Sequence, residues 1–180
     1  MALLGAIFYL IHDIIVKTNL FLIAGLIRQL RGTMNMNKLG GIYAEYPKIS
    51  LLIALVLFSL AGIPPLSGFW PKIYLIEAAF FSENYFFIVS IIIGSFITLY
   101  VLAKFWAEVF WKNASTDEVI VDSFKPLKYY KKVLLVLPIG ILGLTTLYIG
   151  LNAEMIIQVA EKISSEMLDT KPYIKAVLGK

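Results

Sequence analysis

Long apolar stretches separated by short polar segments dominate the pattern of this sequence. Four stretches of the 180-residue chain reach or approach the roughly 20 apolar residues that cross a bilayer core as a helix. They cover residues 3–27, 49–81, 85–111 and 133–151. The pattern predicts an all-α, polytopic transmembrane helix bundle with about four spans over residues 1–153.

The second stretch is interrupted near its middle. A continuous helix over 49–81 would extend about 50 Å, which is too long for one upright crossing. Glycines and prolines break it, because proline removes a hydrogen-bond donor and clashes with the preceding turn; they are Gly62, Pro64, Pro65, Gly68 and Pro71. We expect half-helices over 49–62 and 69–81, joined by an unwound segment at 62–68. In lipid, such backbone persists only when it is buried in protein or lines a wet cavity.

A hairpin of two tight spans with a surface Pro-Pro turn is the alternative. One broken crossing places the loops at 28–48 and 112–132 on the same side of the membrane, whereas a hairpin separates them. Both loops are basic, and the turn at 82–84 contains no Lys or Arg. The positive-inside rule therefore favours the broken helix, with both loops in the cytoplasm and both termini outside.

The C-terminal tail at 154–180 follows a different pattern. Its apolar residues recur at helical spacing; they are Ile156, Val159, Ala160, Ile163 and Met167. This amphipathic tail is expected to continue the fourth helix, to lie at the outer surface, or to pack on a neighbouring protein.

Composition narrows the class of protein. Hydrophobic residues make up 59% of the chain and charged residues only 16%, which excludes a soluble enzyme and a disordered chain. The chain has no cysteine and one histidine, so we expect no disulfide framework, no metal site and no cofactor. The net charge of +4 lies largely in the membrane-flanking loops and indicates a lipid bilayer, with no nucleic-acid footprint.

Three ionisable residues lie within the first span. His12, Asp13 and Lys17 each cost roughly 2.5–3.5 kcal/mol at a helix centre on insertion scales. Asp13 and Lys17 are four residues apart and can pair as a structural clasp. Such pairing leaves His12 unexplained, and histidine titrates near neutral pH. A proton relay through the three residues is the favoured interpretation, and the clasp is the alternative.

Lys72 follows the interruption of the second span. A lysine here lies beside carbonyls that the break frees, and broken helices at the midplane recur as ion sites. Its pKa can shift on burial, so the side chain could load and release a proton. Glu77 is an accessory candidate in the second half-helix. If the hairpin were correct, Lys72 would instead extend to the surface.

Lys104 and Glu108 form an i,i+4 combination in the last turns of the third span. We expect the two side chains to pair at the cytoplasmic interface. A role in proton entry or exit is a second interpretation.

Two segments resemble a known family. Residues 12–22 read HDIIVKTNLFL and are similar to the H-x(4)-K-x-x-LFL stretch of antiporter-like membrane proteins. Residues 60–72 read LAGIPPLSGFWPK and resemble the LAGIPPLSGF-x-x-K signature of the same family, and residues 105–111 also fit. This superfamily comprises proton-pumping subunits of respiratory complex I and large subunits of Mrp-type Na⁺/H⁺ antiporters. Within it, the chain looks closest to the D subunits of Mrp antiporters.

The resemblance implies more than the pattern does. It covers the C-terminal part of a longer inverted-repeat transporter, so the chain is expected to be a fragment. It implies that Lys17 is a central relay residue with His12 alongside, and that Lys72 is the terminal relay lysine. Asp13 departs from the family, because a second histidine is expected at this position.

The leading hypothesis is a proton-translocating subunit of a multisubunit Na⁺/H⁺ antiporter in the cell membrane. Its partners would be other membrane subunits, lipid, H⁺ and Na⁺. The first alternative is an antiporter-like subunit of complex I, with any redox chemistry in other subunits. The second is a structural four-span subunit without an ion path. No constellation of residues typical of an enzyme accompanies His12.

Overall fold

The computed structural model describes residues 1–113 and 122–169, and residues 171, 174, 177 and 179 singly. Within these residues the regular structure is helical, which confirms the all-α prediction. The elements in order are α1 (Ala2–Arg31), η1 (Met36–Lys38), α2 (Ile42–Glu45), α3 (Pro47–Ala61), α4 (Phe69–Phe81), α5 (Tyr85–Trp106), the π-helical η2 (Ala107–Trp111), α6 (Tyr129–Leu151) and α7 (Ala153–Leu168).

Local sequence explains where the helices begin and end. Gly32 ends α1 and Gly62 ends α3, both in the left-handed conformation that glycine adopts without steric cost. Pro47 begins α3, where its missing N–H removes no helix hydrogen bond. The Asn84 side chain accepts a hydrogen bond from the Phe87 N–H and caps α5.

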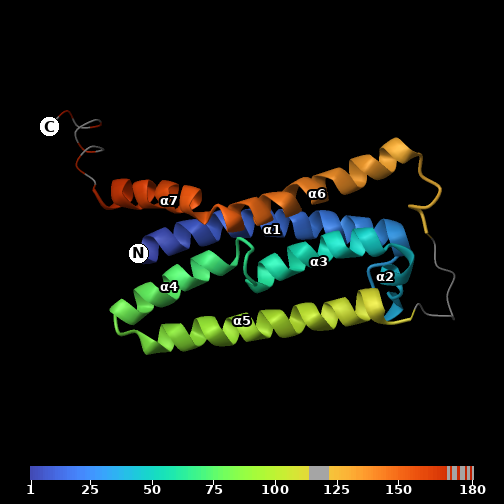
Figure 1. The fold of residues 1–180 in the computed structure, drawn as a ribbon, viewed down its shortest axis with the longest axis horizontal. Coiled ribbons are helices and arrows are strands. Elements are labelled where there is room, and N and C mark those ends of the chain that lie inside the picture. The colour runs from blue at the N-terminus through green and yellow to red at the C-terminus, as the bar shows by residue number, and fades with distance from the viewer. Residues whose placement is uncertain (114–121, 170, 172–173, 175–176, 178, 180) are drawn as a thin grey trace.

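The second apolar stretch forms one discontinuous helix. The spans Ala2–Arg31, Tyr85–Trp111 and Tyr129–Leu151 are each long and apolar enough to cross a membrane. By contrast, α3 and α4 have 15 and 13 residues and extend only about 20 Å each, less than a bilayer core. Figure 1 shows α3 and α4 following one another along the bundle, beside the uninterrupted α5. The two half-helices together therefore cover the length that α5 covers alone.

The break contains residues 62–68, and Pro71 lies outside it. Pro71, named among the helix-breaking residues, lies in the first turn of α4. A proline in a first helical turn is tolerated because the N–H groups there have no partner within the helix.

The two basic loops lie at the same end of the bundle (Figure 1). The Gly41 N–H donates to the Lys112 carbonyl at 2.6 Å, and the Ser123 N–H donates to the Gln29 carbonyl at 3.0 Å. Residues 114–121 of the predicted loop at 112–132 lie outside the described residues. One broken crossing requires the two loops to lie at the same end of the bundle, as they do. That this end faces the cytoplasm stays a prediction.

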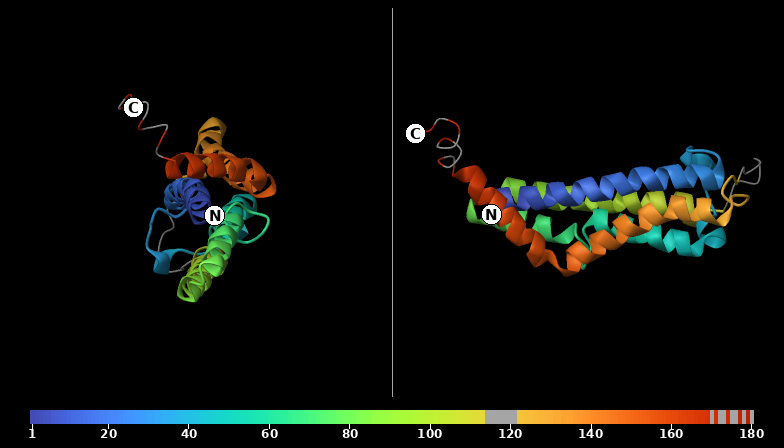
Figure 2. Two further views of the ribbon diagram at one scale, coloured as in Figure 1. Left: turned by 90° about the vertical axis from the view of Figure 1, so that its left-hand side faces the viewer. Right: turned by 90° about the horizontal axis from the view of Figure 1, so that it is seen from above.

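At Asn152 the chain turns from α6 into α7, and the two helices form a V in the right-hand view of Figure 2. A small apolar cluster of Phe8, Ile149 and Ala153 holds the turn against α1, and Ile156 packs against it. Of the apolar residues expected in the tail, Ala160 is buried, whereas Val159, Ile163 and Met167 are exposed. The tail beyond Asp169 lies largely outside the described residues.

The main hydrophobic core is off-centre in the bundle. It joins α1, α3 and α6, with Val16, Ile53 and Ile139 fully buried in it. No residue of α5 is buried, so this helix presents apolar side chains outward over most of its length. Such a surface is suited to lipid or to further apolar protein.

Candidate functional site

Two hydrogen bonds hold the break and the start of α4 against backbone carbonyls of α6. The Ser67 N–H donates to the Thr146 carbonyl at 3.1 Å, and the Trp70 indole N–H donates to the Gly150 carbonyl at 2.7 Å. A side chain on Gly150 would place its Cβ in overlap with the Pro65 carbonyl oxygen. The unwound segment therefore packs directly on α6, and only glycine fits at position 150 of that helix.

His12 reaches the break from α1. Its side chain is 1% exposed, and Nδ1 lies 2.8 Å from the Ser67 hydroxyl. The Ser67 hydroxyl lies 3.3 Å from that of Ser59, which is also buried. A Cβ on Gly68 would lie within 3 Å of the imidazole, so the break backbone approaches the ring closely. A hydroxyl can donate or accept, so either tautomer of His12 fits this arrangement.

Lys72 reaches the break from the first turn of α4. Its Nζ donates to the carbonyl of Ala61, the last residue of α3, at 2.9 Å. This carbonyl has no partner within the helix because α3 ends there. The side chain is half-buried and turns back toward the break. This geometry is the one predicted for a lysine beside a freed carbonyl.

Asp13 and Lys17 lie on a different face of α1. They form the predicted ion pair at 2.8 Å, with side chains that are 21% and 62% exposed. Successive helical residues point about 100° apart, so His12 faces the break while its neighbour Asp13 does not. The structure thus brings His12 and Lys72 together at the break, whereas the Asp13–Lys17 ion pair lies away from it. Glu77 lies further along α4 and has no hydrogen bond or ion pair to Lys72 in the described part of the chain.

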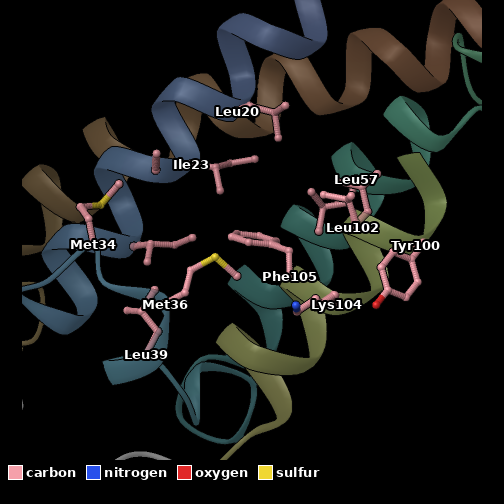
Figure 3. A pocket seen from close by; sticks show the side chains of 13 residues that line it. Leu20, Ile23, Met34, Met36, Leu39, Leu57, Tyr100, Leu102, Lys104 and Phe105 are labelled. Carbon is pink, nitrogen blue, oxygen red and sulfur yellow. The ribbon is translucent and has the colours of Figure 1, made fainter. Parts of the chain in front are cut away.

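The predicted pairing of Lys104 with Glu108 is wrong. Glu108 instead pairs with Lys112 at 3.2 Å. Glu108 lies in the π-helical segment Ala107–Trp111, and Lys112 follows that segment directly. Lys104 lines a cavity of about 600 Å³ that is otherwise walled by apolar side chains of α1, α5 and the loop after α1 (Figure 3).

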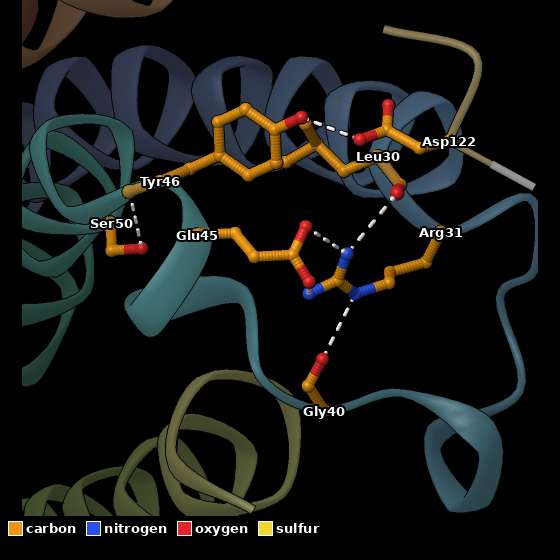
Figure 4. Close-up of polar contacts among 7 residues, drawn as sticks. All are labelled: Leu30, Arg31, Gly40, Glu45, Tyr46, Ser50 and Asp122. Atoms are coloured by element: carbon orange, nitrogen blue, oxygen red, sulfur yellow. Dashed lines mark hydrogen bonds and ion pairs between the residues drawn. The ribbon is translucent and has the colours of Figure 1, made fainter. Parts of the chain in front are cut away.

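Arg31 is the principal polar residue that sequence reasoning missed. It follows the first apolar stretch and reads there as an ordinary loop cation. In the structure its side chain is buried and forms two hydrogen bonds with the Glu45 carboxylate, at 3.2 and 3.0 Å. Its Nε also donates to the Gly40 carbonyl at 2.9 Å (Figure 4). The two-pronged geometry ties the loop after α1 to the end of that helix.

A contact between side chains joins the two basic loops, at 28–48 and 112–132. The Tyr46 hydroxyl donates to the Asp122 carboxylate (Figure 4). Burial and this bond raise the pKa of Tyr46 to about 12. Burial opposes the charged form of Asp122, but bonds from Tyr46 and from the backbone N–H groups of Lys125 and Phe124 outweigh it and lower the pKa of this carboxyl. The bond therefore persists across neutral pH.

This arrangement defines a class of protein: a polytopic helical membrane protein with a discontinuous helix and a lysine at its break. Residues 1–98 match the family described as NADH:quinone oxidoreductase/Mrp antiporter, transmembrane. The chain belongs to this family.

Within this family, the chain is similar to D subunits of Na⁺/H⁺ antiporters and to a chain of an Mrp complex. The chain is 36% identical over 178 residues to the D subunit of the Na⁺/H⁺ antiporter of Alkalihalophilus pseudofirmus, covering 99% of this chain and 35% of that protein. It is 34% identical over 174 residues to the corresponding D subunit of Bacillus subtilis, covering 97% and 34%. The Mrp complex structure from Dietzia sp. DQ12-45-1b contains a similar chain, with a TM-score of 0.82 and 25% identity, covering 98% of this chain and 40% of that one. The chain spans about a third of the length of these curated relatives.

Proposed function

We propose that this chain is part of the D subunit of an Mrp-type antiporter, which resides in the cell membrane, assembles with other membrane subunits and exchanges Na⁺ for H⁺. The family match and the relatives among antiporter D subunits support this assignment. The family also includes subunits of NADH:quinone oxidoreductase. The reported relatives are antiporter subunits, and they favour antiport.

Within this larger protein, His12 and Lys72 carry protons past the break. The observation that supports the role most strongly is that two titratable side chains from different helices converge on one interruption of the backbone. Histidine can exchange a proton near neutral pH, and the Ser67 hydroxyl offers it a hydrogen-bonding neighbour. The Ala61 carbonyl dipole stabilises the charged form of Lys72, and half-burial opposes it. Opposing effects of this kind suit a group that must both gain and lose a proton.

The Asp13–Lys17 pair would deliver protons to this break from another part of the protein. The pair lies on an outward face of α1, where further helices of a longer protein could pack. Glu77, beyond Lys72 on α4, is the accessory candidate on the far side. The two basic loops would lie in the cytoplasm, as the positive-inside rule predicts.

The test measures Na⁺-dependent proton flux in inverted vesicles that contain the complete antiporter complex. Lys72→Ala should reduce flux by about 100-fold, the scale of losing one proton-transfer group. Lys72→Arg should also fail, because arginine keeps the charge but does not release its proton.

Lys104→Ala is the matched control, since Lys104 is another lysine of the apolar helices but lines a cavity away from the break. It should retain flux at equal assembly. Undiminished flux in correctly assembled Lys72→Ala complexes would favour a structural subunit without an ion path.

A further inference from the structure

The first turn of α4 is not capped by the residue before it. Helix α4 begins at Phe69, and Gly68 at its N-cap has no side chain to accept a hydrogen bond. The Phe69 N–H donates to the Leu66 carbonyl at 3.2 Å, which links the turn only to the break itself. The orientation of this turn about the helix axis therefore depends on contacts with neighbouring helices.

Trp70 supplies such a contact with α6. Its indole N–H donates to the Gly150 carbonyl at 2.7 Å. Gly150 lies in the last turn of α6, where carbonyls lack partners within the helix, so this acceptor is available. The Trp70 ring also packs against the apolar cluster of Phe8, Ile149 and Ala153. A directional hydrogen bond and apolar packing thus hold the ring between α1 and the joint of α6 and α7.

Lys72 lies on the same helical turn as Trp70 but points in another direction. The two residues are two positions apart, which separates their side chains by about 200° around the helix axis. Trp70 faces α6, whereas the Lys72 Nζ donates to the Ala61 carbonyl of α3 at 2.9 Å. One helical turn therefore connects the two hydrogen bonds. A rotation of α4 that released the indole would move the ammonium away from its carbonyl acceptor.

We propose that Trp70 is a positioning residue, whose hydrogen bond to Gly150 fixes the rotation of α4 and thereby holds the Lys72 ammonium at the break for proton transfer. The indole N–H is a donor only, so Trp70 exchanges no proton itself. This role rests on the proposed function of Lys72 as a proton carrier. Loss of the bond should lower the rate of transport, because a reacting group misplaced by about 1 Å costs about 100-fold in rate.

Flux measurements on the complete antiporter complex test this role. Trp70→Phe removes the N–H and keeps an aromatic ring. Na⁺-dependent proton flux per assembled complex at saturating Na⁺ should fall about tenfold or more, with the half-saturating Na⁺ concentration unchanged. A merely structural tryptophan would change the amount of assembled complex and leave the flux of each complex as it was. Trp111→Phe is the matched control and should retain full flux, because Trp111 is 67% exposed and lies beyond α5.

A second variant separates the hydrogen bond from the shape of the ring. Benzothienylalanine at position 70 replaces the indole N–H with sulfur at nearly the same shape, so the complex should assemble and show the same loss of flux. Full flux per complex in this variant would overturn the positioning role, as would a raised half-saturating Na⁺ concentration at unchanged maximal flux. Lys72→Ala judges the proposed relay separately. If Lys72→Ala lowers flux and the position-70 variants do not, the relay stands and the positioning role fails.

Discussion

His12 and Asp13 are adjacent residues with different surroundings. The imidazole is buried beside Ser67 at the break, whereas the carboxylate turns outward to pair with Lys17. The same contrast separates Arg28 from Arg31 at the end of α1. Arg28 is exposed, and Arg31 is enclosed with Glu45 and Gly40. The helix face separates His12 from Asp13, whereas the loop after α1 encloses Arg31 and leaves Arg28 exposed.

Arg31→Ala should destabilise the protein. The substitution removes the hydrogen bonds to the Glu45 carboxylate and the Gly40 carbonyl and leaves the carbonyl without its donor. We expect a loss of about 2 kcal/mol in the free energy of unfolding, because bonds that involve charged groups contribute about 1.5–3 kcal/mol. Thermal denaturation of the detergent-solubilised complex measures the loss. Arg28→Ala should have little effect, and equal melting temperatures for the two variants would argue against the Arg31 cluster.

Among the elements, the discontinuous helix depends most on its neighbours. An unwound segment in an apolar bundle leaves backbone groups that need partners. Thr146 and Gly150 of α6 provide two carbonyl acceptors, and His12 of α1 meets the Ser67 hydroxyl. The break is therefore stabilised jointly by α1 and α6.

Gly150→Ala should separate α6 from the break. Its new Cβ would overlap the Pro65 carbonyl oxygen, a backbone atom that cannot shift cheaply. We expect a cost of about 1–3 kcal/mol or more from overpacking, seen as reduced assembled complex on native gels. Gly140→Ala on the same helix is the control, because its nearest contact would be an ordinary 4.0 Å. If both variants assemble equally well, the close approach at Gly150 is not needed.

The molecule as a whole gathers both basic loops at one end and the turn at 82–84 at the other (Figure 1). The single broken crossing and the contacts between the two loops together explain why the basic residues lie at one end of the molecule. The apolar surface of α5 and the outward Asp13–Lys17 pair mark faces that further parts of a longer protein could cover.

Cysteine labelling in oriented vesicles should reproduce this polarity. Met34→Cys and Lys125→Cys should react with an impermeant maleimide from the cytoplasmic side, because their loops share an end of the bundle. Glu83→Cys should react only from the opposite side. Labelling of Glu83→Cys from the cytoplasmic side would contradict the single broken crossing.

The class of protein, the long helices and the position of the break could all be predicted from local sequence. Apolar length, glycine and proline act locally, so their effects can be predicted without knowing the neighbours. Local spacing also predicted the Asp13–Lys17 pair, but it failed for Lys104 and Glu108. Spacing alone cannot tell which of two lysines four residues away, Lys104 or Lys112, the Glu108 carboxylate contacts.

Only the tertiary structure decided which side chains meet at the break. The contact between His12 and Ser67 joins residues 55 positions apart, and a cavity beside Lys72 is lined by residues of α1, α3, α4 and α5. Arg31 likewise appears as a loop cation until its loop folds back around it. These features depend on how the helices rotate and pack against one another. That packing is determined by many contacts between residues far apart in the sequence.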